Sequence, residues 1–307
     1  MGFLLAVQGA ASQGILWGVM SLGVFITFKV LDFPDLTVDG SFALGGAVGA
    51  VAVSSGVPPL LSLALAFVCG TAAGTVTALL HTKLKIPAIL AGILTMLALY
   101  SVNIRVMGGK ANIPLLGVAT LMRDVSAFTG WDKNISSLAS GAFFSVLIIA
   151  LLYWFFGTEI GASIRATGTN ERMMKAQGVN TDTMKLTGLA LANGLTALSG
   201  ALVAHAQGYA DVGMGTGAIV IALASIIIGD VLFGTHIAFW YTLAGVVLGS
   251  VVYRIIIAAV LQLGMKSSDL KLLTACIVAL ALSVPVFKKS VTRSGRTLGF
   301  SRFKRGE

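Results

Sequence analysis

The chain has 307 residues, of which 56% are hydrophobic and only 11% are charged, and its mean hydropathy is +0.93. A soluble domain carries about 25% charged residues, so this composition excludes a soluble globular enzyme, a disordered chain and a disulfide scaffold. The net charge of +9 is concentrated in the segment 287–307, which holds seven of the 21 Lys and Arg residues, a pattern typical of a membrane protein with a basic tail rather than of a nucleic-acid-binding protein.

Apolar runs long enough to span a bilayer recur along the chain. A membrane-spanning helix needs about 20 mostly apolar residues, and charges separate runs at 1–28, 40–82, 86–104, 134–158, 186–210, 212–229 and 231–253. The run 40–82 is long enough for two helices, with Pro58 and Pro59 at the turn. The pattern continues past Arg254, so helices are expected at about 236–262 and about 268–286. The sequence predicts an all-α, polytopic membrane protein with nine transmembrane helices; eight and ten are the alternatives.

The basic residues indicate how such a protein is oriented, because Lys and Arg in short loops stay preferentially on the cytoplasmic side. With nine helices and a cytoplasmic C-terminus, the N-terminus is external, and fourteen of the 21 basic residues lie on the inner side. The transmembrane region is then 1–286, with a cytoplasmic insert at 158–183, and a basic cytoplasmic tail follows at 287–307.

Glycine spacing predicts where helices approach closely and where the chain turns. Three pairs have the GxxxG spacing that permits close helix packing in membranes: Gly45/Gly49, Gly70/Gly74 and Gly245/Gly249. The stretch 213–217 contains three glycines and precedes an apolar run without following a predicted strand. We interpret it as a flexible turn rather than as a dinucleotide-binding loop.

The polar insert 158–183 carries the signals of a short capped helix. Thr169 or Asn170 can cap its N-terminus, Glu171 complements its dipole, and Gly178 supplies a left-handed stop. A helix of two turns is marginal on its own, so it must pack against something. Its expected exposed apolar residues are Met173, Met174 and Ala176. Flexible Met side chains suit a groove on a partner, but these residues alone favour a simple capped cytoplasmic loop, because short capped loop helices are common.

Known catalytic and cofactor motifs are missing from the sequence. It contains no G-x-x-x-x-G-K-[ST] phosphate-binding loop, no H-E-x-x-H and no G-x-S-x-G, and its three His residues are too scattered for a metal site. We therefore expect no catalytic residue, no metal and no cofactor in this chain, so any ATP hydrolysis that drives it takes place in a separate subunit.

The insert and three other segments carry longer motifs. The insert reads Gly161-x-x-Ile164-Arg165-Ala166-x-Gly168-x-Asn170, then Ala176-x-Gly178-Val179-Asn180. It resembles the cytoplasmic coupling loop of ABC importer permeases in the branched-chain amino acid and ribose/xylose permease superfamily. Segments 186–202, 222–229 and 36–46 resemble other parts of these permeases in the right order. The form of 34–41 is similar to a narrower subfamily, the tryptophan/tyrosine-type permeases.

The resemblance implies a non-enzymatic permease subunit of an ATP-driven importer in the bacterial inner membrane. Its partners would be a cytoplasmic ABC ATPase, an external substrate-binding protein, a second permease copy in a homodimer and membrane lipids, with no nucleic acid. The solute would be small, an amino acid and in the narrower subfamily an aromatic one. The residues implied to couple the permease to the ATPase are Gly161, Arg165, Ala166, Gly168, Asn170, Glu171, Arg172, Met173, Met174, Ala176 and Gly178.

Five polar residues within apolar segments are candidates for the substrate pathway. Asp39 stands where an apolar helix is expected to begin, so it caps helix 40–57, lines the pathway or does both. Arg254 is costly inside a membrane; it either holds an anionic group such as a carboxylate or serves the packing of the bundle. Asn193, His205 and Gln207 share one predicted helix, but Asn193 and His205 differ by roughly 120° in direction, so they form no single stripe.

Two other classes of function compete with the importer. A gradient-driven secondary carrier needs intramembrane acids to carry the coupling charge, and Asp39 is the candidate for that role. A membrane-anchored assembly or sensor protein would move no solute at all. The three hypotheses differ in whether transport requires ATP and in whether an ATPase binds the insert.

Overall fold

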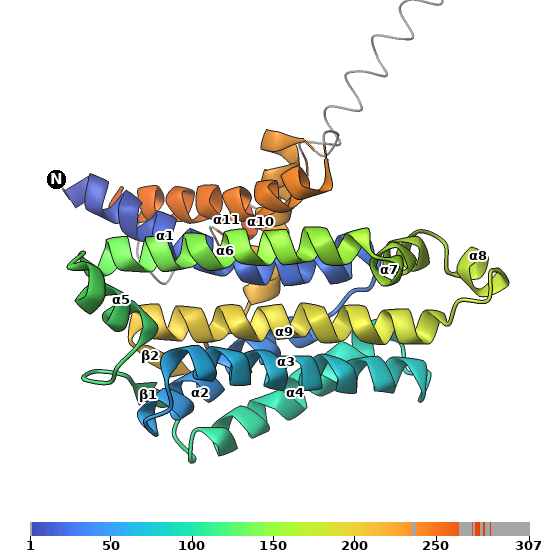
Figure 1. The fold of residues 1–307 in the computed structure, drawn as a ribbon, viewed down its shortest axis with the longest axis horizontal. Helices are drawn as coiled ribbons and strands as arrows, with labels where there is room; N and C mark the ends of the chain where they lie inside the picture. The colour runs from blue at the N-terminus through green and yellow to red at the C-terminus, as the bar shows by residue number, and fades with distance from the viewer. Residues whose placement is uncertain are drawn as a thin grey trace, which may run out of the picture.

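The computed structural model describes residues 2–234 and 238–263, together with positions 272, 274–276, 279 and 283. These residues form a bundle of long helices that run side by side, with shorter elements at both ends (Figure 1). The helix predicted at about 268–286 and the basic tail 287–307 lie outside the described residues, apart from the isolated positions just named.

Seven helices in the described part of the chain are long and apolar enough to cross a membrane. The first is α1 (Gly2–Phe25), which continues as a π-helix, η1 (Ile26–Val30). The others are α2 (Thr37–Ser54), α3 (Pro59–Thr82), α4 (Ala88–Val106), α6 (Lys133–Gly157), α9 (Thr181–Gln207) and α11 (Phe239–Gln262).

The prediction of nine transmembrane helices is confirmed only in part. Seven of the nine predicted helices are present near their predicted positions. The run 212–229 forms α10 (Ala218–Phe233), whose 16 residues are fewer than the roughly 20 that a crossing needs. Helix α10 is short because residues 209–217, which precede it, form a strand and a turn and do not extend the helix.

Short elements mark the two ends of the bundle. At one end, β1 (Asn112–Pro114) pairs antiparallel with β2 (Tyr209–Asp211), and α5 (Leu121–Thr129) lies beside them (Figure 1). At the opposite end lie α7 (Glu159–Thr169) and α8 (Glu171–Ala176), with α8 the outermost element in that view. We call these the strand end and the α7–α8 end.

Glycine contacts hold the helices of the bundle together, as the spacing predicts. Helix α9 packs against α1, α2 and α3, and α11 packs against α1 and α10. A Cβ added to Gly45 would overlap Ala197, one added to Gly74 would overlap Leu189, and one added to Gly249 would overlap Ser225. Because these glycines leave no space between backbones, α9 and α11 are fixed in register against their neighbours.

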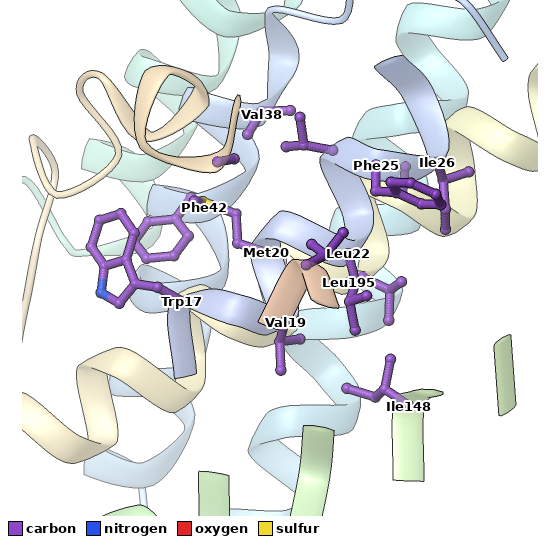
Figure 2. Close-up of a cluster of buried hydrophobic side chains, with 14 of the residues drawn as sticks. Trp17, Val19, Met20, Leu22, Phe25, Ile26, Val38, Phe42, Ile148 and Leu195 are labelled. Atoms are coloured by element: carbon purple, nitrogen blue, oxygen red, sulfur yellow. The ribbon is translucent and has the colours of Figure 1, made fainter. Parts of the chain in front are cut away.

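Local signals set several helix boundaries. Helix α3 begins at Pro59, after Pro58 in an extended conformation, which confirms the predicted turn. Helix α9 ends at Gly208, whose φ of 86° lies in the left-handed region. The core between the long helices is filled by large apolar side chains, among them Trp17 and Phe42, which lie against each other in Figure 2.

Candidate functional site

The insert 158–183 folds as two helices and not as the single short helix predicted. Helix α7 precedes α8, and the two meet at Asn170, whose side-chain Oδ1 accepts a hydrogen bond from the Met173 amide at 3.0 Å. Gly178 has a φ of 82° and ends the segment. Of the two predicted caps, Asn170 is therefore confirmed, and so is the stop at Gly178; the first helix was missed because Gly161 and Gly168 weaken a helical pattern.

Helix α7 is fastened to the bundle by close backbone contacts. Gly168 lies directly against the Val30 carbonyl group of η1, and Gly161 lies against Phe155. The Arg165 guanidinium donates a hydrogen bond to the Phe156 carbonyl at 2.8 Å and stands 5.5 Å from the ring centre of Phe239. Gly161, Arg165 and Gly168 of the predicted coupling set therefore anchor α7, and neighbouring Ala166 is half-buried.

Helix α8 is tied to the start of α9 through Glu171. Its carboxylate pairs with Lys175 at 2.7 Å and with Lys185 at 2.8 Å, and accepts a hydrogen bond from the Thr181 hydroxyl at 3.3 Å. These two lysines lower the pKa of Glu171 from its ordinary value of 4.5 to about 2. Glu171 therefore joins two helices, beyond the dipole interaction that the sequence suggests.

The exposed surface of α8 is smaller than predicted. Met173 is 43% exposed, but Met174 is only 5% exposed, so the prediction that both would face a partner is wrong for Met174. Consecutive residues of a helix point about 100° apart, so one methionine faces solvent and the other faces the protein. The residues that α8 presents are Arg172, Met173, Lys175 and Ala176.

A second polar site lies where the chain breaks between η1 and α2. Residues 31–36 are not helical, and Asp35 among them is buried. Its carboxylate accepts hydrogen bonds from the Thr37 amide at 2.9 Å and from the Asn193 side-chain amide at 2.7 Å. Asn193 in turn accepts a hydrogen bond from Ser41 at 2.7 Å. Asp35 thus caps α2 and links the break to the middle of α9.

Asp39 does not cap its own helix, so the first of the two predicted roles for it is wrong. It lies within the first turn of α2, and its two carboxylate oxygens each accept a hydrogen bond at 2.9 Å, from the amides of Gly217 and Ile219. These amides belong to the start of α10, so Asp39 caps a helix 180 residues away. The residues 213–217 form the predicted turn, and Gly215 lies against the Asp39 backbone.

The break therefore brings two helix N-termini together inside the bundle. The caps of α2 and α10 are both aspartates, and Asn193 beside them is residue 13 of the 27-residue α9. Non-helical backbone at membrane depth is tolerated only where it is buried in protein or lines a cavity. Asp35 was missed in the sequence, although an Asp two residues before a helix start is a capping signal.

Arg254 is half-buried, and its guanidinium is stacked on an aromatic ring. Its guanidinium carbon is 4.1 Å from the ring centre of Trp17 on α1, and Trp17 is 4.7 Å from Phe42 on α2. No acidic side chain of the described residues forms an ion pair with it. The guanidinium thus joins α11 to α1.

His205 and Gln207 lie at the strand end, apart from Asn193, as their spacing predicts. The ring of His205 accepts a hydrogen bond from the Leu121 amide at 3.4 Å and contacts the Ser62 hydroxyl at 3.3 Å. It therefore connects α9 to α5 and α3. Gln207 and His205 line a cavity of about 250 Å³ beneath α5.

Comparison with known proteins gives a family and several relatives. The family described as branched-chain amino acid transport system permease component matches residues 6–283. A tyrosine transport system permease protein of Clostridioides difficile is 39% identical over 287 residues, covering 94% of each chain. An uncharacterized protein of Rickettsia prowazekii is 30% identical and covers 89% of this chain and 95% of its own length. The ribose import permease of Escherichia coli K12 is 26% identical, covering 87% and 81%.

These matches extend over almost the whole length of the chain and of the relatives. They decide against the gradient-driven carrier and the assembly or sensor protein. The chain belongs to the family of branched-chain amino acid transport system permeases and is the multi-pass membrane component of an ABC transporter.

Proposed function

We propose that this permease takes up an amino acid, powered by a cytoplasmic ABC ATPase that binds α8. The observation that carries the proposal is that α8 lies outermost at its end of the bundle with Met173 exposed, while α7 behind it is fastened to η1. A partner that moves α8 would therefore also move the end of α1. Flexible Met side chains suit a groove on such a partner.

In this proposal the α7–α8 end is cytoplasmic and the strand end is external. An external substrate-binding protein delivers the solute at the strand end, and a second copy of the chain completes the pathway. The position of the N-terminus at the strand end agrees with an external N-terminus (Figure 1). The amino acid is inferred from the relative named as a tyrosine transport system permease. Lys29 and Asp230, 2.6 Å apart, would join η1 to α10 on the cytoplasmic side.

The pathway in this proposal passes the break between η1 and α2. Asp39 and Asn193 stand at the break, Arg254 lies next to α1, and His205 and Gln207 stand at the external end. Broken helices near the middle of a membrane are where transporters commonly hold their solutes. The caps in the break would then position the backbone that the solute passes.

The substitution Met173→Asp tests the docking role. A charge on the exposed face of α8 would be desolvated on binding, so we expect ATPase co-purification and ATP-dependent uptake to fall at least tenfold. Leu116→Asp is the matched control for ATPase co-purification, because Leu116 is 88% exposed at the opposite end of the bundle. A Met173→Asp variant that retains a stoichiometric ATPase complex and normal uptake would contradict the proposal.

A further inference from the structure

Arg254 is unusual in where its side chain points. Gly14 of α1 faces Val251 and Gly18 faces Val247, so α1 and α11 run antiparallel. Arg254 lies about two turns before the end of α11 at the strand end. An arginine near a helix end normally extends toward the nearby membrane surface. Here the guanidinium stacks on the ring of Trp17 on α1 instead.

Three polar atoms on the neighbouring helices α1 and α11 are buried and have no hydrogen-bond partner in the part of the chain that the structure describes. The Nε of Arg254, the Nε1 of Trp17 and the Oε1 of Gln13 have no hydrogen-bond partner among the described residues. Gln13 and Trp17 lie four residues apart, so they share one face of α1. Both donors and the acceptor therefore come from facing parts of α1 and α11.

The hydrogen-bonding roles of these three atoms match the two charged groups of an amino acid, its carboxylate and its ammonium group. A guanidinium and an indole N–H are both donors, and a carboxylate offers two oxygens to accept from them. An amide oxygen accepts from an ammonium group. Water could satisfy single hydrogen bonds but brings no counter-charge to the guanidinium. The Nε of Arg254 is buried without a hydrogen-bond partner among the residues described, and an anion beside it would supply both a hydrogen bond and a counter-charge to the guanidinium.

We propose that Gln13, Trp17 and Arg254 form a binding site for the α-carboxylate and α-ammonium groups of the transported amino acid. This inference rests on the proposed function as an amino acid importer. The unused atoms are buried in this structure, so the proposal requires a second conformation of the permease in which the solute can contact them. Trp17 packs against Phe42, and through α2 the site is linked to the break at Asp35.

Direct binding to the purified permease–ATPase complex tests the site, without the external binding protein and in nanodiscs of phosphatidylcholine only. The probes are L-tyrosine and tyramine, which lacks the carboxylate. We expect the wild type to bind L-tyrosine at least tenfold more tightly than tyramine. Arg254→Met should lower L-tyrosine affinity at least tenfold and leave tyramine affinity unchanged, because only the carboxylate contact is lost.

Further variants separate this role from packing. Trp17→Phe keeps an aromatic ring but removes the N–H donor. Arg254→Lys keeps a positive charge but removes the guanidinium. Each should lower the affinity for L-tyrosine several-fold. Arg105→Met is the matched control, since Arg105 is an exposed arginine on α4 and should not matter. The acidic residue nearest to Arg254 along the chain is Asp269. Asp269→Asn should also bind L-tyrosine normally. A loss of affinity equal to that of Arg254→Met would make Asp269 the partner of Arg254 and contradict the site.

Several outcomes would overturn the inference. Among them are an Arg254→Met complex that binds L-tyrosine as the wild type does, or one that loses L-tyrosine and tyramine equally. A wild-type complex that binds none of the twenty amino acids does the same. If native membranes yield an anionic lipid bound to the wild type and absent from Arg254→Met, the anion is a lipid headgroup and the inference fails. ATPase co-purification that is retained in the Arg254→Met complex leaves the docking of the ATPase on α8 standing. Met173→Asp tests that docking and not the solute site.

Discussion

Polar side chains cap helix N-termini both in the α7–α8 segment and in the break between η1 and α2. The first segment lies at an exposed end of the bundle, and the second is buried within it. In the first, Asn170 and Asn180 cap the helices that directly follow them, and the partly exposed Glu171 pairs with Lys175 and Lys185. In the second, Asp35 and Asp39 cap helices inside the bundle, and Asp39 accepts a hydrogen bond from Gly217, 178 residues later and directly before α10. Loss of a capping side chain therefore costs little free energy of folding where water can take its place, and more where only protein surrounds the freed amides.

The largest effect is expected from Asp35→Ala. The substitution leaves the Thr37 amide and one Asn193 contact unsatisfied in the buried break. Each unsatisfied buried group costs about 1–3 kcal/mol, so we expect a loss of about 3 kcal/mol or more in the free energy of unfolding. Unfolding in mixed detergent micelles measures it. Asp132→Ala is the control, because Asp132 precedes α6 and its side chain makes no capping hydrogen bond; equal losses in both variants would refute the importance of the buried cap.

An intermediate effect is expected from Gly168→Ala, which tests how α7 is joined to η1. The new methyl group would overlap the Val30 carbonyl group, so α7 has to shift. Overpacking of this kind costs about 1–3 kcal/mol. We expect the ATPase to stay bound while ATP-driven uptake falls several-fold. Gly157→Ala, where nothing stands within 4 Å of the new atom, should transport normally. Uptake unchanged in Gly168→Ala would mean that this contact does not transmit motion.

The smallest effect is expected in the pH dependence of the stability of α8. Because the pKa of Glu171 is depressed from 4.5 to about 2, its ion pairs stabilise α8 fully above pH 4.5 and are lost as the pH falls toward 2. Glu171 is 35% exposed, so solvent screening limits the effect to about 1 kcal/mol or less. Hydrogen exchange of the α8 amides should accelerate between pH 4.5 and pH 3 relative to Glu171→Gln, which lacks this titration. Identical pH profiles in the two proteins would exclude the contribution.

Much of the membrane-spanning pattern could be predicted from the sequence. The seven long helices lie close to their predicted ranges because length and hydropathy decide a spanning helix. The turn at Pro58 and Pro59 and the cap at Asn170 were readable because each depends on neighbours in the chain. The predicted exposure of Met174 failed, because which side of a short helix faces the protein depends on how that helix docks.

The sequence by itself determined that this is an apolar helical bundle with a polar segment at one end, since hydrophobicity and capping act over one helix at a time. Only the tertiary structure decided the pairings within the bundle. It placed Asp39 on α10, joined Asp35 to Asn193 and laid Arg254 over Trp17. Those partners lie between 158 and 237 residues apart along the chain, a separation at which no local pattern specifies a contact.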